Sequence, residues 1–131
     1  MNKPLIDKLS KKNILVIDDD GLVTRTLCNL LKRGGYFASG TESSSEAIEQ
    51  AEDTDYNLII ADIKMPEVDG VETINRIQAL SRVHNKPKVP VVFITGYADD
   101  DNVSQAKRLG EVIFKPFDNN EFLHRIAKYL D

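Results

Sequence analysis

Apolar residues along the chain follow two alternating patterns, one typical of buried strands and the other of amphipathic helices. Short continuous apolar runs predict strands that are covered on both faces; they span residues 13–18, 36–40, 57–62, 91–95 and 112–115. Between these runs, apolar residues recur every three or four positions, as on one face of a helix. The predicted helices cover residues 23–31, 43–51, 71–80, 103–109 and 122–130. This alternation predicts a parallel sheet with right-handed crossover connections.

The expected fold is α/β, a doubly wound (βα)5 arrangement of the flavodoxin-like kind. It has five parallel strands in the order 2-1-3-4-5, with helices on both faces. Boundary signals agree: Gly34 ends the first helix, Ser43-x-x-Glu46 forms a capping box, and prolines at 87–90 are expected to break the third helix. A length of 131 residues suits one domain. We expect this domain to span residues 13–131, after an N-terminal arm of residues 1–12.

Polar residues stand where four of the predicted strands end. In chain order they are Asp18, Asp19 and Asp20 after the first strand, Asp62 at the end of the third, Thr95 at the end of the fourth and Lys115 at the end of the fifth. The carboxyl ends of the strands in an open parallel sheet line one crevice, where such folds bind ligands. We therefore expect these side chains to meet at one site, with Asp20 serving as a helix start.

The carboxylates at this edge need a neutralising charge. Two carboxylates about 4 Å apart repel by roughly 4 kcal/mol at an effective dielectric of 20. A hard divalent cation neutralises such a group, and Mg²⁺ is the usual one where carboxylates, waters and a phosphoryl group share a site. The Lys115 ammonium and the Thr95 hydroxyl can bind phosphoryl oxygens. The chemistry that fits is phosphoryl transfer onto a carboxylate, with Asp62 as the nucleophile.

Composition and missing motifs disfavour other functions. A net charge of −4 gives no electrostatic footprint for nucleic acid, and no apolar run approaches the roughly 18 residues of a membrane span. We therefore expect a cytoplasmic protein that binds neither nucleic acid nor membranes. Neither histidine nor cysteine stands at the strand ends, which argues against a thiol or serine triad. Cys28 is expected to be a buried helix residue, and His84 and His124 to face solvent.

Four motifs at the predicted strand ends together resemble a known family. They are Ile-Leu-Val-Ile-Asp18-Asp19-Asp20, Asp62-Ile-Lys-Met65-Pro66-Glu-Val-Asp69-Gly70, Phe-Ile-Thr95-Gly96-Tyr97 and Lys115-Pro116-Phe117. This succession resembles the receiver domain of bacterial two-component response regulators, over about residues 13–131. Any single motif is weak evidence, and the specificity lies in their order and their placement.

The resemblance implies a phosphoacceptor in a phosphorelay. Asp62 would take a phosphoryl group from a phosphohistidine on a sensor histidine kinase or a histidine phosphotransfer protein. Asp19, Asp62 and the backbone carbonyl of Lys64 would bind Mg²⁺ directly, and Asp18 would act largely through a water. The domain would modify itself and would not be a turnover enzyme.

The resemblance also implies a conformational switch. Thr95 and Lys115 would bind the phosphoryl oxygens, with Thr95 moving toward them, and the Lys115-Pro116 bond is expected to be cis. The switched domain would control a downstream protein or an output domain. A phosphorylation-dependent homodimer, formed by the last two helices and the last strand, is a further partner arrangement that the resemblance allows.

One position departs from the family pattern. Receivers commonly carry Tyr or Phe three residues before the lysine, and Val112 stands there in this chain. The segment from Gly110 to Lys115 also looks about two residues shorter than usual. We hypothesise that Thr95 and the following loop carry the signal, with Tyr97 or Phe114 as a substitute aromatic.

Three other interpretations stay open. Asp18-x-Asp20-Gly21 resembles the nucleophile motif of haloacid-dehalogenase-type phosphatases, which would make Asp18 the reacting group. A docking module that is never phosphorylated could share the receiver fold. A flavodoxin-like electron carrier could share it too, but its phosphate loop should not be acidic.

Overall fold

The computed structural model describes residues 11–96 and 101–130, which form five strands and five helices in strict alternation. In chain order these are β1 (Asn13–Ile17), α2 (Gly21–Arg33), β2 (Phe37–Thr41), α3 (Ser44–Asp53), β3 (Leu58–Asp62), α4 (Gly70–Val83), β4 (Val91–Thr95), α5 (Asp101–Leu109), β5 (Glu111–Phe114) and α6 (Asn119–Ala127). Most of the predicted arm, residues 1–10, and Tyr97 lie outside the described residues.

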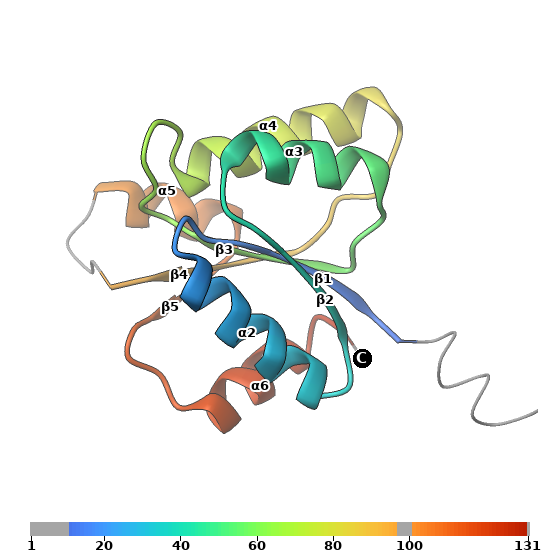
Figure 1. Cartoon of the computed structure of the whole chain (residues 1–131). Helices are drawn as coiled ribbons and strands as arrows, with labels where there is room; N and C mark the ends of the chain where they lie inside the picture. Colours follow the sequence, from blue (N-terminus) through green and yellow to red (C-terminus); the bar gives the residue numbers. More distant parts are fainter. Residues whose placement is uncertain (1–10, 97–100, 131) are drawn as a thin grey trace, which may run out of the picture.

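All neighbouring strands pair in parallel, in the order β2-β1-β3-β4-β5. The predicted doubly wound flavodoxin-like fold is therefore confirmed. Its carboxyl edge lies at the left of the view in Figure 1, where β1 leads into α2 and β3 leads into the loop before α4. The register places Asp62 beside Ile94 and Thr95 beside Phe114 at this edge.

The sheet is buried between two layers of helices (Figure 1). Alternate strand residues point to opposite faces, so each strand contributes to two cores. Helices α3, α4 and α5 cover one face, where Leu15 and Phe93 are buried, and α2 and α6 cover the other, where Ile14 and Phe122 are buried. This double burial explains why the strand sequences are continuous apolar runs rather than alternating ones. Within the described residues, no helix combines the length and apolar character that a membrane crossing requires.

Short polar side chains start the helices. Asp20, Ser43, Asp69 and Asp118 are the N-caps of α2, α3, α4 and α6, and each accepts a hydrogen bond from a backbone N–H in the first turn. The expected role of Asp20 as a helix start is therefore confirmed. Of the capping box expected at Ser43, the structure shows the bond from the Glu46 backbone N–H to the Ser43 hydroxyl at 3.2 Å.

The end of α4 differs from the prediction that the prolines would break this helix. The helix already ends at Val83, and Asn85 adopts a left-handed conformation with φ of 55°. Asparagine tolerates this conformation better than most residues, so it terminates the helix before Pro87 is reached.

A close backbone approach shapes the loop after β3. Gly70, the first residue of α4, donates its N–H to the carbonyl oxygen of Ile63 at 2.7 Å. A Cβ atom at this position would lie 2.0 Å from the backbone carbonyl oxygen of Asp62. Glycine is therefore the residue that lets α4 begin directly against the end of β3.

A cluster of ionic side chains joins α6 to β5. Arg125 Nε donates to Glu111 Oε2 at 2.8 Å, Tyr129 Oη donates to Oε1 at 2.6 Å, and Lys128 Nζ lies 2.9 Å from Oε1. Burial by itself raises the pKa of Glu111, but hydrogen bonds from Tyr129, Lys128 and Arg125 outweigh it and lower that pKa to about 2. The carboxylate is therefore held in its charged form.

We predict that Glu111→Gln destabilises the fold and changes its acid sensitivity. The pKa of Glu111 falls from 4.5 to about 2 on folding, so its stabilisation is complete above pH 4.5 and is lost as the pH falls toward 2. Urea unfolding at neutral pH should show a free energy of unfolding lower by about 2 kcal/mol. The difference from wild type should shrink in acid. The exposed Glu49→Gln is the matched control, and equal stabilities of both variants at neutral pH would contradict the prediction.

We also predict that Gly70→Ala lowers the free energy of unfolding by at least about 2 kcal/mol, because the added methyl group overlaps backbone atoms. Urea unfolding monitored by circular dichroism measures this change. Gly96→Ala is the control, since an added Cβ there meets no described atom within 4 Å. A Gly70→Ala protein as stable as the Gly96→Ala protein would show that the loop moves aside freely.

Candidate functional site

An open crevice of about 800 Å³ lies at the carboxyl edge of the sheet. Among the residues that line it are Asp18, Asp19, Asp62, Lys64 and Lys115, which come from the ends of β1, β3 and β5. The structure therefore brings together the acids and the lysine that the sequence places at separate strand ends. Asp20 also lines the crevice, although its side chain caps α2.

The three acids Asp18, Asp19 and Asp62 form one compact cluster. One carboxylate oxygen from each lies within 4.8 Å of the others. Asp18 is buried, with 3% of its surface exposed, while Asp62 is half-buried and Asp19 is exposed. At the carboxyl edge of the sheet, the cluster therefore presents oxygen atoms at three depths below the surface, with Asp19 outermost and Asp18 deepest.

Asp18 is held firmly at the bottom of this cluster. Its Oδ1 accepts the backbone N–H of Asp20 at 2.9 Å, and Lys115 Nζ lies 3.8 Å from its Oδ2. The hydroxyl of Thr24 donates to the backbone carbonyl of Asp18 at 3.1 Å. Both carboxylate oxygens of Asp18 thus have partners, and its backbone is anchored to α2.

The pKa values of Asp62 and Asp18 are raised first by burial and further by the neighbouring negative charges. Burial, followed by the charge of Asp18, raises the pKa of Asp62 to about 6, although Lys115 and a hydrogen bond from the Lys64 backbone oppose the rise. Burial also raises the pKa of Asp18, against the opposing hydrogen bond from Asp20 and the charge of Lys115. One lysine therefore does not fully offset three carboxylates, and the donor set of clustered carboxylate oxygens suits a hard divalent cation.

Thr95 is the last residue of β4, and Lys115 directly follows β5, the neighbouring strand. The backbone N–H of Lys115 donates to the carbonyl of Thr95 at 2.9 Å, and the Lys115-Pro116 bond is cis, as expected. Thr95 is fully buried at the end of β4, and the next residue, Gly96, lines the crevice. The side chain of Thr95 lies on the same sheet face as that of Phe93, and Thr95 is the direct neighbour of Phe114 across the strand pair.

Two supporting interactions were not foreseen from the sequence. Thr24 fastens α2 to Asp18, and its position four residues after the Asp20 cap was the only signal that could have suggested it. Asn102 Nδ2, on α5, donates to Asp69 Oδ2 at 3.1 Å. Asp69 caps α4 with its other oxygen, so this bond ties the loop after Asp62 to α5. No pattern in the chain pairs Asn102 with a residue 33 positions earlier.

Comparison with known proteins places this geometry in a family. The family model of the response regulator receiver domain matches residues 14–127. The response regulator receiver protein CpdR of Brucella abortus is 32% identical over 123 residues, covering 91% of this chain and 97% of CpdR. The transcriptional regulatory protein ResD of Bacillus subtilis is 30% identical, covering 95% of this chain and 50% of ResD. For ZraR of Escherichia coli K12 the identity is 31%, and the match covers 90% of this chain but 26% of ZraR.

Solved structures share the fold. A CheY-like response regulator receiver domain protein of Methanospirillum hungatei superposes with a TM-score of 0.81 at 27% identity, covering 92% of this chain and 94% of that one. The receiver domain of the sensor histidine kinase PA1611 of Pseudomonas aeruginosa, described with a magnesium ion in its active site cleft, has a TM-score of 0.77 at 21% identity, covering 92% of this chain and 98% of that one. Because the family model matches most of the chain and the strand order agrees, the protein belongs to the response regulator receiver domain family.

Proposed function

We propose that Asp62 is the phosphoacceptor of this receiver domain. A carboxylate oxygen of Asp62 attacks the phosphorus of a phosphohistidine, a P–O bond forms, and the P–N bond to the imidazole breaks. The observation that carries the proposal is the cluster of Asp18, Asp19 and Asp62, whose oxygens lie within 4.8 Å beside Lys115 in an open crevice. A half-buried carboxylate in such a crevice is accessible to a donor on another protein.

The surroundings of the acids favour Asp62 over Asp18 as the nucleophile. Asp18 is buried, and its two oxygens are occupied by the Asp20 N–H and by Lys115. Asp62 is less buried and stands at the end of the central strand β3. This difference argues against the phosphatase interpretation, which needs Asp18 free to react.

The acidic cluster has the ligands that Mg²⁺ requires. Asp19, Asp62 and the backbone carbonyl of Lys64 would hold the ion directly, and Asp18 would act largely through a water, with further waters completing the coordination. When bound, the ion would neutralise the carboxylates and the negative charge of the phosphoryl group. The magnesium described for the PA1611 receiver domain, which has the same fold, supports this assignment.

The remaining polar residues position the phosphoryl group. Lys115 Nζ, 3.8 Å from Asp18 and directed at the crevice, would bind one phosphoryl oxygen. Thr95 would donate its hydroxyl to another oxygen after moving toward the site from the end of β4. Both residues bind and orient, and neither forms a covalent bond.

The partners follow from the family. The donor would be a sensor histidine kinase or a histidine phosphotransfer protein. The chain spans nearly all of CpdR but about half of ResD and a quarter of ZraR. The phosphorylated domain would therefore act on a separate downstream protein or on an output domain, with a phosphorylation-dependent homodimer as one form of that response.

The signal is proposed to pass from Thr95 to Phe114. Val112 holds the position of the usual aromatic and packs in the core that α3, α4 and α5 cover. Phe114 lies on the same face, next to Thr95, is 38% exposed, and has the Lys107 Nζ of α5 lying 6.0 Å from its ring centroid. A shift of Thr95 would thus meet an aromatic ring that also contacts α5. Tyr97, the other substitute considered, lies outside the described residues.

The phosphorylation proposal predicts a mass shift that depends on Asp62 and on Mg²⁺. Incubation with phosphoramidate and Mg²⁺ should add one phosphoryl group to the wild-type protein, as measured by intact mass. Asp62→Asn should abolish this adduct, and so should chelation of the metal.

Asp20→Asn is the matched control, because it changes another acid of the crevice while asparagine still caps the helix. Its adduct should persist. An adduct on Asp62→Asn would show that another residue accepts the phosphoryl group and would remove the proposal. The absence of an adduct on wild type would also remove it and would favour the docking-module interpretation.

The coupling proposal predicts that Phe114→Leu separates phosphorylation from its response. The variant should form the adduct normally, since Phe114 does not line the crevice. Phosphorylation-dependent changes in the amide NMR shifts of α5, around Lys107, should fall at least severalfold, and Thr95→Ala should have the same effect.

Phe37→Leu is the control for this prediction. Phe37 is another exposed phenylalanine with a lysine over its ring, Lys11 at 4.9 Å, but it lies on the far edge strand β2. A full α5 response in either Phe114→Leu or Thr95→Ala would exclude this route.

A further inference from the structure

A second hollow lies at the opposite edge of the sheet from the acidic crevice. It has a volume of about 230 Å³ and is bounded by α4, the amino ends of β3 and β4, and the segment that joins α4 to β4. Its apolar wall is made by Ile59, Ile74, Ile77, Val89 and Val91. No residue of the phosphoryl site lines this hollow, so it is a separate feature.

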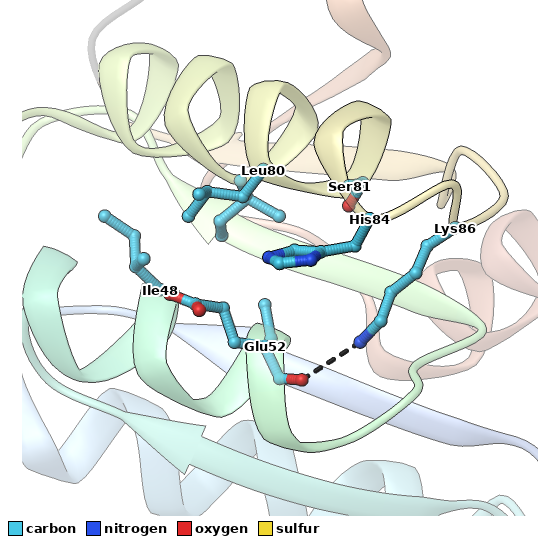
Figure 2. A pocket seen from close by; sticks show the side chains of 8 residues that line it. Ile48, Glu52, Leu80, Ser81, His84 and Lys86 are labelled. Carbon is cyan, nitrogen blue, oxygen red and sulfur yellow. Dashed lines mark hydrogen bonds between the residues drawn. The ribbon is translucent and has the colours of Figure 1, made fainter.

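The joining segment is fixed in place on the α3 side. Lys86 Nζ donates to the backbone carbonyl of Glu52 at 3.0 Å and lies 3.5 Å from Asp55 Oδ1. Figure 2 shows this lysine reaching from the segment after α4 to the end of α3, while His84 points into the gap between the two helices. Lys86 also lines the hollow, and its charge is already engaged by these contacts on the α3 side.

Gln78 supplies a hydrogen-bond donor at the apolar wall. Its Nε2 atom is buried and has no hydrogen-bond partner within the part of the chain that the structure describes. A buried amide without a partner is costly. The terminal torsion of glutamine is broad and roughly two-fold, so a half-turn brings the NH₂ group to the other side of the side chain. After this half-turn the NH₂ group would face the hollow and could donate to an acceptor there, while the amide oxygen would take the buried position.

The rim of the hollow is positively charged. Arg82 and Lys88 both line it and are exposed, and neither side chain makes an ion pair within residues 11–96 and 101–130. An apolar wall, one unsatisfied donor and two available cations together match a ligand that has an apolar body and a negatively charged acceptor.

We propose that this hollow binds a small organic carboxylate with a compact apolar body. The apolar part would pack against Ile77 and Val89, and the carboxylate would accept from Gln78 Nε2 and face Arg82 and Lys88. Pockets for drug-sized ligands measure roughly 300–1,000 Å³, so a hollow of about 230 Å³ suits a smaller molecule, with a single ring or a short branched chain.

The test uses phenylacetate as the probe and phenylacetamide as its uncharged counterpart. Titration of ¹⁵N-labelled protein should give saturable shifts of the Gln78 side-chain amide and of the Val89 and Val91 backbone amides. Phenylacetamide should bind at least several times more weakly. Gln78→Met, which keeps the length of the side chain but removes the donor, should weaken phenylacetate binding roughly tenfold. Lys88→Gln should weaken it about two- to fivefold.

Arg76→Gln is the matched control, since it removes one positive charge from an exposed position of the same helix, outside the hollow. It should bind phenylacetate as wild type does. Phosphorylation of Gln78→Met by phosphoramidate at the wild-type level would show that the fold is intact. The absence of saturable shifts, equal binding of phenylacetamide, or undiminished binding by Gln78→Met would each overturn the proposal.

Discussion

The crowding of three carboxylates at one edge of a parallel sheet is the constraint around which this protein is built. Parallel strands bring the residues that follow β1 and β3 to the same edge, so Asp18, Asp19 and Asp62 meet within 4.8 Å. At about 4 Å and an effective dielectric of 20, each pair of charges repels by roughly 4 kcal/mol. Lys115 and the Asp20 N–H offset part of this repulsion. The remaining negative charge is what suits the crevice to the divalent cation and the phosphoryl group proposed for it.

Contacts with the neighbouring helices hold the backbone around the acidic cluster in place. Thr24 anchors the backbone of Asp18 to α2, and Gly70 lets α4 start against the carbonyl of Asp62. Asp69 caps α4 and also receives a hydrogen bond from Asn102 on α5. The backbones of Asp18 and Asp62 are therefore each fixed by an adjacent helix, which limits how far these two acids can move apart. The proposed cation site depends on this rigidity, because mobile carboxylates that repel one another would move apart into solvent.

Helix α4 connects two chemically opposite regions. Its first turn lies beside the acidic crevice, and its last turns border an apolar hollow with a cationic rim. The layer that contains α4 also includes α5, which contacts Phe114 through Lys107. The proposed route from Thr95 to Phe114 and the apolar hollow thus both lie on the face formed by α3, α4 and α5. Helices α2 and α6 cover the other face of the sheet.

The sequence by itself determined the alternation of strands and helices, the capping residues and the acids at the strand ends, because these depend on local periodicity and on short motifs. The strand order could be expected only through the fold class that this alternation indicates. Tertiary structure decided what depends on contacts between distant segments. Asn102 joins Asp69 across 33 positions, and Phe114 lies beside Thr95. Strand register and helix packing set such distances, and neither is encoded in the pattern of any single segment.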